Sequence, residues 1–498
     1  MNPPPFQRVL IANRGEIALR VIATAAEMGI ETVAVYSEPD RNALHVRRAD
    51  IAICIGPAAP SASYLNQDRI LEAAREAGAD CLHPGYGFLA ENAAFAEKCE
   101  AAGITFLGPS PSAIRAMGDK VAARRVAKEA GVPLVPGLDD PADASDLAAI
   151  AEQIGYPVML KAAAGGGGKG IRIIRDPAEL AQAADLASAE ALAAFGDGRV
   201  YLEKFVTKPR HVEVQIMADR HGRVVAYGER ECSVQRRHQK RVEESPCAVL
   251  TEELRAKMCD AACALARAVE YVGAGTVEFL YSEGEFYFLE MNTRLQVEHP
   301  VTEVRFGVDL VREQFRVAAG EPVAEPREPI GHAIEVRVNA EDPETFFPSL
   351  GTIRRLAPPG GPGVRLDASM FVGHEVTPHY DSMLGKLIVH AADRGQAIER
   401  AIRCLREFRI VGVSTSLPVA LRVFHSAEFR SGDYDTGILE RIDRSVPEVR
   451  NEIASLAAVV AKIQRSEKWS AGASHGGGES ITPWVLVDRM SRVGGPRR

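Results

Sequence analysis

Long hydrophobic runs are absent from this 498-residue sequence, although 46% of its residues are hydrophobic. No apolar stretch approaches the roughly 20 residues that a membrane-spanning helix needs. The N-terminus, MNPPPFQRVLIANRGE, lacks the basic segment and the apolar core of a signal peptide. We therefore expect a cytoplasmic protein that has no membrane partner.

An excess of positive charge and clustered cysteines are also missing. The formal net charge is −8, which gives no reason to expect a nucleic acid or an anionic membrane as a partner. The eight cysteines are scattered, and only Cys259 and Cys263 lie close together, with no histidine at zinc-site spacing. We interpret the cysteines as buried, reduced thiols that take no part in chemistry.

A dinucleotide-binding motif is missing from the first βαβ unit. Apolar residues Val9–Ala12 and Thr32–Tyr36 predict two strands, and the periodic stretch Ile17–Met28, ended by Gly29, predicts the helix between them. The turn reads NRGE and contains no G-x-G-x-x-G, so the usual pyrophosphate cradle is absent. This unit is predicted to be scaffold.

The rest of the chain divides into regions of different pattern, as its length requires, because one core does not extend over so many residues. Alternating helices and strands continue to about residue 110, and two hairpins follow, which turn at His221–Gly222 and around Gly284. The Pro-rich stretch AAGEPVAEPREPIGH predicts a boundary near 320–331. A β-rich region comes next, and the last 30 residues are typical of a flexible tail.

A glycine loop stands between two strand-like runs in VMLKAAAGGGGKGIRII. Glycines let backbone N–H groups approach phosphate oxygens, and Lys169 adds a positive charge. No Ser or Thr follows Lys169, so this is not a Walker A loop. We favour a mobile hairpin flap over a triphosphate, with a simple linker as the alternative.

The second hairpin predicts a metal site. Glu278 and Glu290 lie six residues on either side of Gly284, so they come close to facing each other. Opposed like charges are destabilising unless something neutralises them, and Mg²⁺ prefers carboxylate oxygens. Asn292 adds a third oxygen ligand, whereas two solvated glutamates are the alternative.

Two polar segments remain. In EMNTRLQVEHPVTE, five polar residues from Glu290 to Glu298 share one parity, so an extended chain would place them on one face. QRRHQKR, residues 235–241, is a basic island that a solvated charge run or a nucleic-acid patch could explain. Near a metal–nucleotide site, a pocket for phosphate or a small oxyanion fits it better.

Nine segments together resemble those of biotin carboxylase, an ATP-grasp enzyme. They are IANRGEIALR, HPGYGFLAEN, MGDK, KAAAGGGGKG, RRHQK, GTVEF, EMNTRLQVEHPVTE, RVNAEDP and YDSMLGKL. The resemblance runs to about residue 445 and implies a multidomain fold of the α/β and α+β classes. Its parts would be an N-terminal αβ (pre-ATP-grasp) domain over 1–115, an ATP-grasp domain over 116–330 with a glycine-loop lid at about 133–205, and a β-rich C-terminal domain over 331–447. The tail over 448–498 matches nothing that we can assign.

The resemblance also implies roles for individual residues. The residues that would bind ATP are Lys120, Lys161, Gly167, Gly168, Glu203, Lys204, Phe205, Val206, His211, Gln235 and His238. Those that would hold Mg²⁺ or Mn²⁺ are Glu278, Glu290 and Asn292. Those that would bind bicarbonate are Lys240, Arg294, Gln296 and Val297, with Glu298 as the base. Arg337, Tyr86 and Gly87 would contact biotin, and the catalytic set would be Arg294, Glu298, Arg337 and Lys240.

The implied reaction is ATP- and bicarbonate-dependent carboxylation of biotin through carboxyphosphate. No Ala-Met-Lys-Met sequence occurs, so biotin would arrive on a separate carrier protein, and carboxyltransferase subunits and a homodimer are further expected partners. Ala164 stands where some family members have another glycine, and we expect no loss of function from it. The final acyl-CoA or keto-acid substrate is not specified by this sequence.

Two alternatives share part of this evidence. Another ATP-grasp carboxylate–amine ligase would use the same lysines and metal ligands, but would not need RRHQK together with NTRLQVEHP. A silent nucleotide-binding scaffold is the other, and the presence of every expected catalytic residue is evidence against it.

Overall fold

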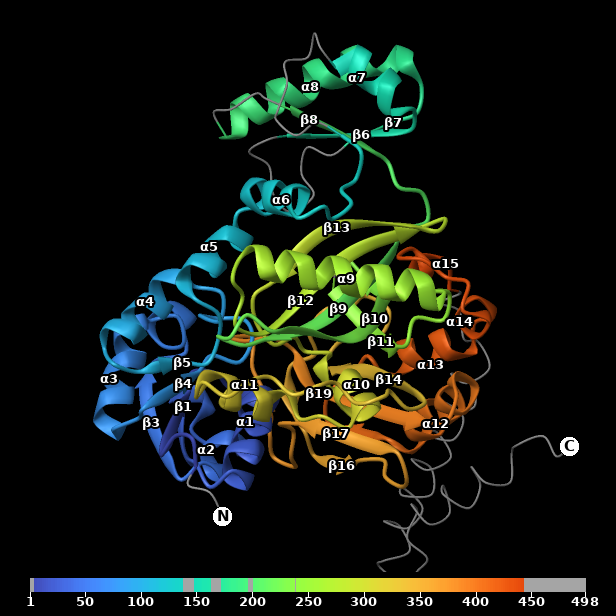
Figure 1. Ribbon diagram of the computed structural model, residues 1–498. Coiled ribbons are helices and arrows are strands. Elements are labelled where there is room, and N and C mark those ends of the chain that lie inside the picture. The colour runs from blue at the N-terminus through green and yellow to red at the C-terminus, as the bar shows by residue number, and fades with distance from the viewer. Residues whose placement is uncertain (1–3, 138–146, 163–171, 196–199, 238, 443–498) are drawn as a thin grey trace, which may run out of the picture. The chain divides into compact units, whose positions relative to one another are not determined.

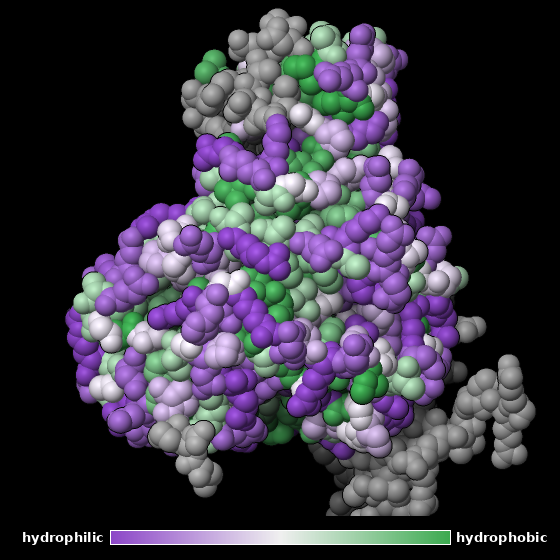
Figure 2. Space-filling model, in the orientation of Figure 1, coloured by the Kyte–Doolittle hydropathy of each residue, from purple (hydrophilic) through white to green (hydrophobic). Residues whose placement is uncertain are grey.

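The computed structural model describes residues 4–137, 147–162, 172–195, 200–237 and 239–442 (Figure 1). Gly167, Gly168, His238 and the tail from 443 onward lie outside the described residues. Among the residues that are described, no helix is long and apolar enough to cross a membrane. Hydrophilic residues cover most of the face shown in Figure 2.

The N-terminal region is a parallel five-stranded sheet in the order β3-β2-β1-β4-β5. The βαβ prediction is confirmed, because β1 pairs in parallel with β2 and α1 connects them. Asn66 and Asn92 cap two later helices by accepting a hydrogen bond from a backbone N–H in the first turn. The elements are β1 Arg8–Ile11, α1 Gly15–Glu27, β2 Glu31–Ser37, α2 Leu44–Arg48, β3 Ile51–Gly56, α3 Gln67–Ala77, β4 Cys81–His83, α4 Ala93–Ala101 and β5 Thr105–Phe106, with 3-10 turns at Glu38–Asp40 and Pro60–Ala62.

A small antiparallel sheet in the order β7-β6-β8 brackets the glycine loop. The antiparallel pairing of β6 with β7 confirms that the strands on either side of the loop form a hairpin. Helices α7 and α8 pack on this sheet (Figure 1). The elements from α5 onward are α5 Pro111–Gly118, α6 Lys120–Glu129, α7 Leu147–Ile154, β6 Val158–Ala162, β7 Arg172–Ile174, α8 Pro177–Phe195 and β8 Val200–Lys204.

The largest sheet has eight strands in the order β13-β12-β9-β10-β11-β14-β19-β17. Both predicted hairpins are confirmed, since β9 pairs with β10 and β12 with β13, in each case antiparallel. The elements are β9 Arg210–Ala218, β10 Val224–Arg236, β11 Gln239–Ser245, α9 Glu252–Ala268, β12 Gly273–Ser282, β13 Glu285–Asn292, α10 His299–Phe306 and α11 Leu310–Ala318. The eight cysteines are free thiols, most of them buried, as predicted.

The sheet continues without a break past the Pro-rich stretch at 320–331. Strand β11 pairs with β14 from Val242↔Val336 to Ser245↔Ala333, and β14 pairs in turn with β19. The remaining elements are β14 His332–Asn339, β15 Gly351–Thr352, β16 Arg355–Ala357, β17 Val364–Ala368, β18 Glu375–Val376, β19 Met383–Ala391, α12 Arg394–Glu407, β20 Arg409–Val411, α13 Leu417–His425, α14 Ala427–Ser431 and α15 Ile438–Arg441.

The polar run from Glu290 to Glu298 is not one extended strand, so the expectation of a single shared strand face is wrong beyond Asn292. Strand β13 ends at Asn292, and α10 begins at His299 with Glu298 as its N-cap. The chain leaves the sheet after Asn292, and Pro300, in the first turn of α10, suits a helix start and not a strand interior. The polar side chains nevertheless converge, by a turn instead of by alternation.

Candidate active site

The hairpin of β12 and β13 brings two carboxylates together as predicted. Glu278 is the register partner of Glu290, and the amide Nδ2 of Asn292 donates to Glu278 Oε1 over 2.9 Å. Burial and the charge of Glu278 raise the pKa of Glu290, as expected when two carboxylates lie close together. The two carboxylates fit a hard divalent cation such as Mg²⁺, and Asn292 would add its amide oxygen in place of the bond that this oxygen accepts from Arg294 Nη2.

The ammonium of Lys240 is the centre of the buried charges. Its Nζ lies 2.6 Å from Glu213 Oε2, 2.6 Å from Glu298 Oε1 and 3.0 Å from Glu278 Oε1. Burial alone would lower the pKa of Lys240, but these three carboxylates outweigh it and raise the pKa well above its ordinary value. Lys240 is therefore a permanent cation that joins the metal-side carboxylates to Glu298.

Glu298 lies between two cations. Its Oε1 accepts from Lys240, and its Oε2 accepts from Arg337 Nη2 over 3.0 Å. Burial would raise the pKa of this carboxyl, but Lys240 and Arg337 hold it well below its usual range. Glu298 is thus ionised at neutral pH and can accept a proton once a substrate takes over these hydrogen bonds.

Arg294 lies on the other side of Asn292, within reach of the same site. Its Nη2 donates to Asn292 Oδ1 over 3.0 Å, and its Nε donates to Glu91 Oε2 over 2.9 Å. Glu91 also accepts from the backbone N–H of Thr293 over 3.1 Å. Glu91 therefore fixes the plane of the Arg294 guanidinium, a role that sequence reasoning missed because the two residues are far apart in the chain.

Gln296 and Val297 also reach the site, and the groups by which they do so are hydrogen-bonded to other residues of the protein. Gln296 Nε2 donates to Glu278 Oε1 over 2.8 Å. The carbonyl of Val297 accepts from Lys386 Nζ over 2.5 Å. Their expected contacts with bicarbonate stay a prediction.

Arg230 holds several residues around Lys240 and Glu278 in place, and its role was not predicted from the sequence. It is fully buried, and its five N–H donors bond to Glu213, Gln215, Thr302, Thr276 and Gln296. A signal existed in HVEVQIM, because His211, Glu213 and Gln215 share one parity of a strand whose other parity is apolar. The same parity argument, applied to this strand, would have found the acidic partner of Arg230.

The predicted ATP-binding residues lie around the same sheet. Lys120 is exposed at the start of α6, and His211 Nε2 lies 2.9 Å from Glu278 Oε2. Gln235 is the buried register partner of Lys240. Lys161 is placed on β6, but its side chain, like Gly167, Gly168 and His238, lies outside what the structure describes.

The segment Glu203–Val206, predicted to hold adenine, leaves β8 half-buried. Glu203 pairs with Arg124 over 3.2 Å. Lys204 Nζ donates to the carbonyl of Gly155 over 2.8 Å. These contacts fix the backbone of the segment but do not themselves test the adenine prediction.

Tyr86 and Gly87, predicted to line the biotin pocket, follow β4. The Tyr86 hydroxyl donates to Glu16, and its ring centroid lies 5.9 Å from Lys386 Nζ. Lys386 is fully buried and is the register partner of Arg337. The structure therefore brings Tyr86 to the neighbourhood of Arg337, whereas Gly87 is exposed beside it.

The basic island divides between two faces of the sheet. Lys240 and Gln235 belong to the charged cluster, whereas Arg241 pairs with Glu341 over 2.7 Å. The guanidinium of Arg236 stacks 4.0 Å from the ring of Phe346. Only part of QRRHQKR thus lies on the face of the charged cluster, because successive strand residues point to opposite faces.

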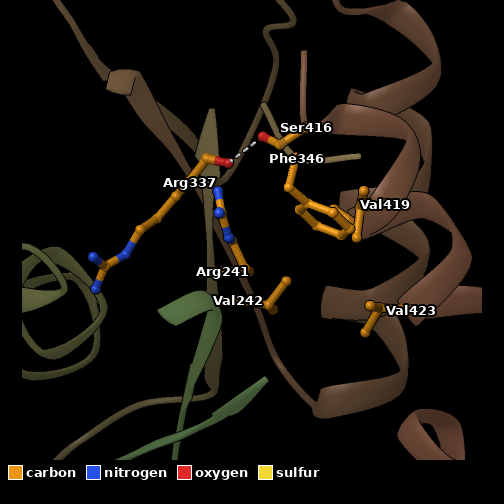
Figure 3. Close-up of a pocket in the computed structure, with 8 residues that line it drawn as sticks. Arg241, Val242, Arg337, Phe346, Ser416, Val419 and Val423 are labelled. Carbon is orange, nitrogen blue, oxygen red and sulfur yellow. Dashed lines mark hydrogen bonds between the residues drawn. The ribbon is translucent and has the colours of Figure 1, made fainter. Parts of the chain in front are cut away.

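A small pocket behind Arg337 shows how its strand is held. Figure 3 shows the Arg337 guanidinium turned away from this pocket, while its backbone carbonyl accepts from the Ser416 hydroxyl over 2.9 Å. The same hydroxyl accepts from the backbone N–H of Asn339 over 3.0 Å. Ser416 therefore ties two backbone groups of β14 on either side of Val338.

Replacing Ser416 with alanine is expected to destabilise the protein by about 1–3 kcal/mol, because two backbone groups lose a buried partner. Ser416→Thr keeps the hydroxyl and is expected to restore most of the loss. Urea unfolding followed by circular dichroism measures both variants. An alanine variant as stable as the wild type would show that Ser416 does not hold the strand.

Comparison with known proteins now identifies the family. Family profiles match at 5–114 (biotin carboxylase, N-terminal domain), 119–326 (carbamoyl-phosphate synthase L chain, ATP binding domain) and 335–441 (biotin carboxylase C-terminal domain). The biotin carboxylase of Haemophilus influenzae is 51% identical over 445 residues, which cover 88% of this chain and 98% of the relative. The chain belongs to the biotin carboxylase family.

Other members of the biotin carboxylase family are parts of different carboxylases. A pyruvate carboxylase subunit of Methanothermobacter thermautotrophicus is 50% identical over 465 residues, 92% of this chain and 95% of the relative. A dimer of the biotin carboxylase domain of Hydrogenobacter thermophilus 2-oxoglutarate carboxylase, solved with MgADP, ADP and bicarbonate, has a TM-score of 0.80 and 47% identity. The match covers 88% of this chain and 99% of that chain. The protein is an ATP-dependent ligase that carboxylates biotin, with the three-part fold of its family.

Proposed function

We propose that Lys240 and Arg294 bind bicarbonate and that Glu298 removes its proton. The observation that supports this most strongly is the position of Glu298, whose two oxygens bond to Lys240 and to Arg337. A bound oxyanion would take the Lys240 hydrogen bond, so the pKa of Glu298 would rise toward that of a useful base. The Arg294 fork suits a planar oxyanion and is oriented by Glu91.

Glu278, Glu290 and Asn292 would hold Mg²⁺ beside the ATP phosphates. When bound, the cation neutralises phosphate charge and so helps the attack of bicarbonate on ATP. Lys240 and His211, which contact Glu278 at 3.0 and 2.9 Å, keep this carboxylate ionised. Burial would raise the pKa of Glu278, but these two neighbours hold it well below its usual value.

Arg337 would contact the ureido group of biotin, with Tyr86 and Gly87 lining the approach. Its guanidinium is oriented by Glu243 at 2.5 Å and Glu298 at 3.0 Å. By analogy with the relative that is a subunit of pyruvate carboxylase, biotin would come on a separate carrier protein, and a carboxyltransferase would use the product. The homodimer is proposed by analogy with the dimeric relative.

The experiment that tests this function measures bicarbonate-dependent ATP hydrolysis with and without free biotin. We expect biotin to stimulate hydrolysis in the wild type. Arg337→Lys is expected to lose this stimulation by about tenfold or more, since a lysine cannot replace a two-pronged charged contact. Arg241→Lys is the matched control, because Arg241 is likewise paired with a glutamate, but at Glu341.

Retained stimulation in Arg337→Lys would contradict the biotin role of this residue. Equal loss in both variants would mean that the effect is structural. ATP hydrolysis that does not respond to bicarbonate in the wild type would contradict the proposed site as a whole.

A further inference from the structure

Two glutamates face each other across β11 and β14, directly beside Arg337. Glu243 and Glu335 are register partners on these antiparallel strands, and both are fully buried. Glu335 precedes Arg337 by two residues, so both side chains project from the same face of β14. Two ionised carboxylates opposed in this way would repel each other in a region that water does not screen.

Three of the four carboxyl oxygens of this pair have no hydrogen-bond partner among the described residues. Neither Oε atom of Glu335 has a hydrogen-bond partner among the described residues, and the same holds for Oε2 of Glu243. Oε1 of Glu243 accepts from Arg337 Nε over 2.5 Å. A buried carboxylate without a single hydrogen bond is very costly, whereas a protonated carboxyl is much less so.

The neighbouring charges do not balance both glutamates. The charged and titratable groups that face Glu335 are Glu243 from β11, Arg337 from β14, Lys386 from β19, Glu298 from the turn before α10 and Tyr86 from the loop after β4. Arg337 already bonds to Glu243 and Glu298. Lys386 bonds to the carbonyl of Val297 and lies 3.4 Å from Glu16 Oε2.

Each cation near Glu335 is therefore engaged by another carboxylate. Burial raises the pKa of Glu335 well above its usual value, and Glu243 adds to this effect. Burial likewise raises the pKa of Glu243 to about 7, in opposition to Arg337. The raised pKa values of Glu335 and Glu243 agree with the geometry, in which the neighbouring cations balance the charge of only one of the two carboxylates.

We propose that Glu335 carries a proton at neutral pH and acts as a positioning residue for Arg337. A neutral Glu335 leaves Glu243 as the ionised anchor of the guanidinium, which then points toward Glu298. An ionised Glu335 would compete with Glu243 for Arg337 and pull it away from the site. The role in catalysis rests on the proposed function, whereas the proton on Glu335 does not.

The first test counts protons. Glu335 is ionised in the unfolded chain at pH 7, so wild-type protein denatured in guanidinium should release one proton from this position. Glu335→Gln, which has the shape of the protonated acid, should release one proton fewer than the wild type. Asp40→Asn is the control, because Asp40 is also buried but its bond to Arg14 lowers the pKa of its carboxyl, and its release should equal that of the wild type. Equal release from wild type and Glu335→Gln would overturn the proposal.

The second test uses the pH profile of biotin-dependent ATP hydrolysis. As pH rises through the folded pKa of Glu335, kcat of the wild type should fall, whereas Glu335→Gln cannot ionise and its alkaline limb should move to higher pH. Glu335→Ala should lower kcat with little change in the KM for ATP, and Glu335→Gln should restore it. An unchanged alkaline limb in Glu335→Gln would contradict the positioning role.

A third measurement can overturn the proposal with the wild-type protein alone. A protonated buried carboxyl gives the carbonyl stretch of a carboxylic acid in the infrared spectrum, which an ionised one does not. Its absence from the wild-type spectrum at pH 7 would overturn the proposal, and its weakening in Glu335→Gln would support it. Neither the proton count nor this spectrum uses a substrate, so their failure is distinguishable from failure of the proposed function.

Discussion

Glu298→Gln is expected to lower bicarbonate-dependent ATP cleavage by about 10²-fold or more, the scale of general-base catalysis. Glutamine keeps the size of the side chain but cannot accept a proton from bicarbonate. Lys240 would also lose one of its three carboxylate partners, although Glu213 and Glu278 would still hold it. Steady-state kinetics at saturating bicarbonate measure the effect on kcat.

Nucleotide binding supplies the control for this variant. The residues expected to bind ATP do not include Glu298, so ATP affinity, measured by equilibrium binding, should change little. Lys240 and Arg337 hold the pKa of Glu298 well below its ordinary range in the free enzyme, so kcat/KM for bicarbonate should show no acid limb from this residue near neutral pH. A variant with the turnover of the wild type would rule out Glu298 as the base.

Arg230→Met is expected to destabilise the protein by about 3–5 kcal/mol, the usual cost of removing one partner from a buried ion pair. Methionine fills much of the volume but supplies none of the five donors. Glu213 would then face Lys240 alone, and Gln296 would lose the bond that orients it. Activity should fall with stability, because Gln296 contacts Glu278.

A double-mutant cycle separates this charge effect from packing. Arg230→Met with Glu213→Gln should be less destabilised than the sum of the single variants, by about 1–3 kcal/mol, since the unpaired charge is gone. Urea unfolding followed by far-ultraviolet circular dichroism measures all three. Strict additivity would contradict the ion-pair explanation.

Local patterns predicted the fold well where one side of an element is buried. The βαβ unit and both hairpins could be predicted from apolar periodicity and turn residues, because these elements depend on interactions between residues close in sequence. The pairing of Glu278 with Glu290 was predicted from symmetry about Gly284, but the structure reaches it by a different route. Near the turn the register is Phe279↔Phe288, and a bulge that leaves Leu289 unpaired restores the glutamate pair. The correct pairing was thus partly fortuitous.

Long-range partners could not be predicted in the same way. Glu91, Lys386 and Arg230 reach the site from elements distant in the sequence, and no local spacing indicates which buried charge meets which. The bend after Asn292 was also missed, because alternation of polar residues does not distinguish a strand from a turn that leads into a helix. The roles assigned by resemblance to individual residues stay predictions for kinetics to test.

Because β11 pairs with β14, one sheet includes strands from both sides of the Pro-rich stretch at 320–331. This stretch is therefore a joint between two regions of the sequence, but it does not separate two independent structural units. A fragment that began at 331 would present β14 as an exposed edge, with its row of unmatched amide groups open to aggregation. Arg337 would leave with that fragment, and Glu243 would stay behind. The proposed reaction centre therefore spans the joint: the polypeptide could be cleaved there, but the two fragments should not be active apart.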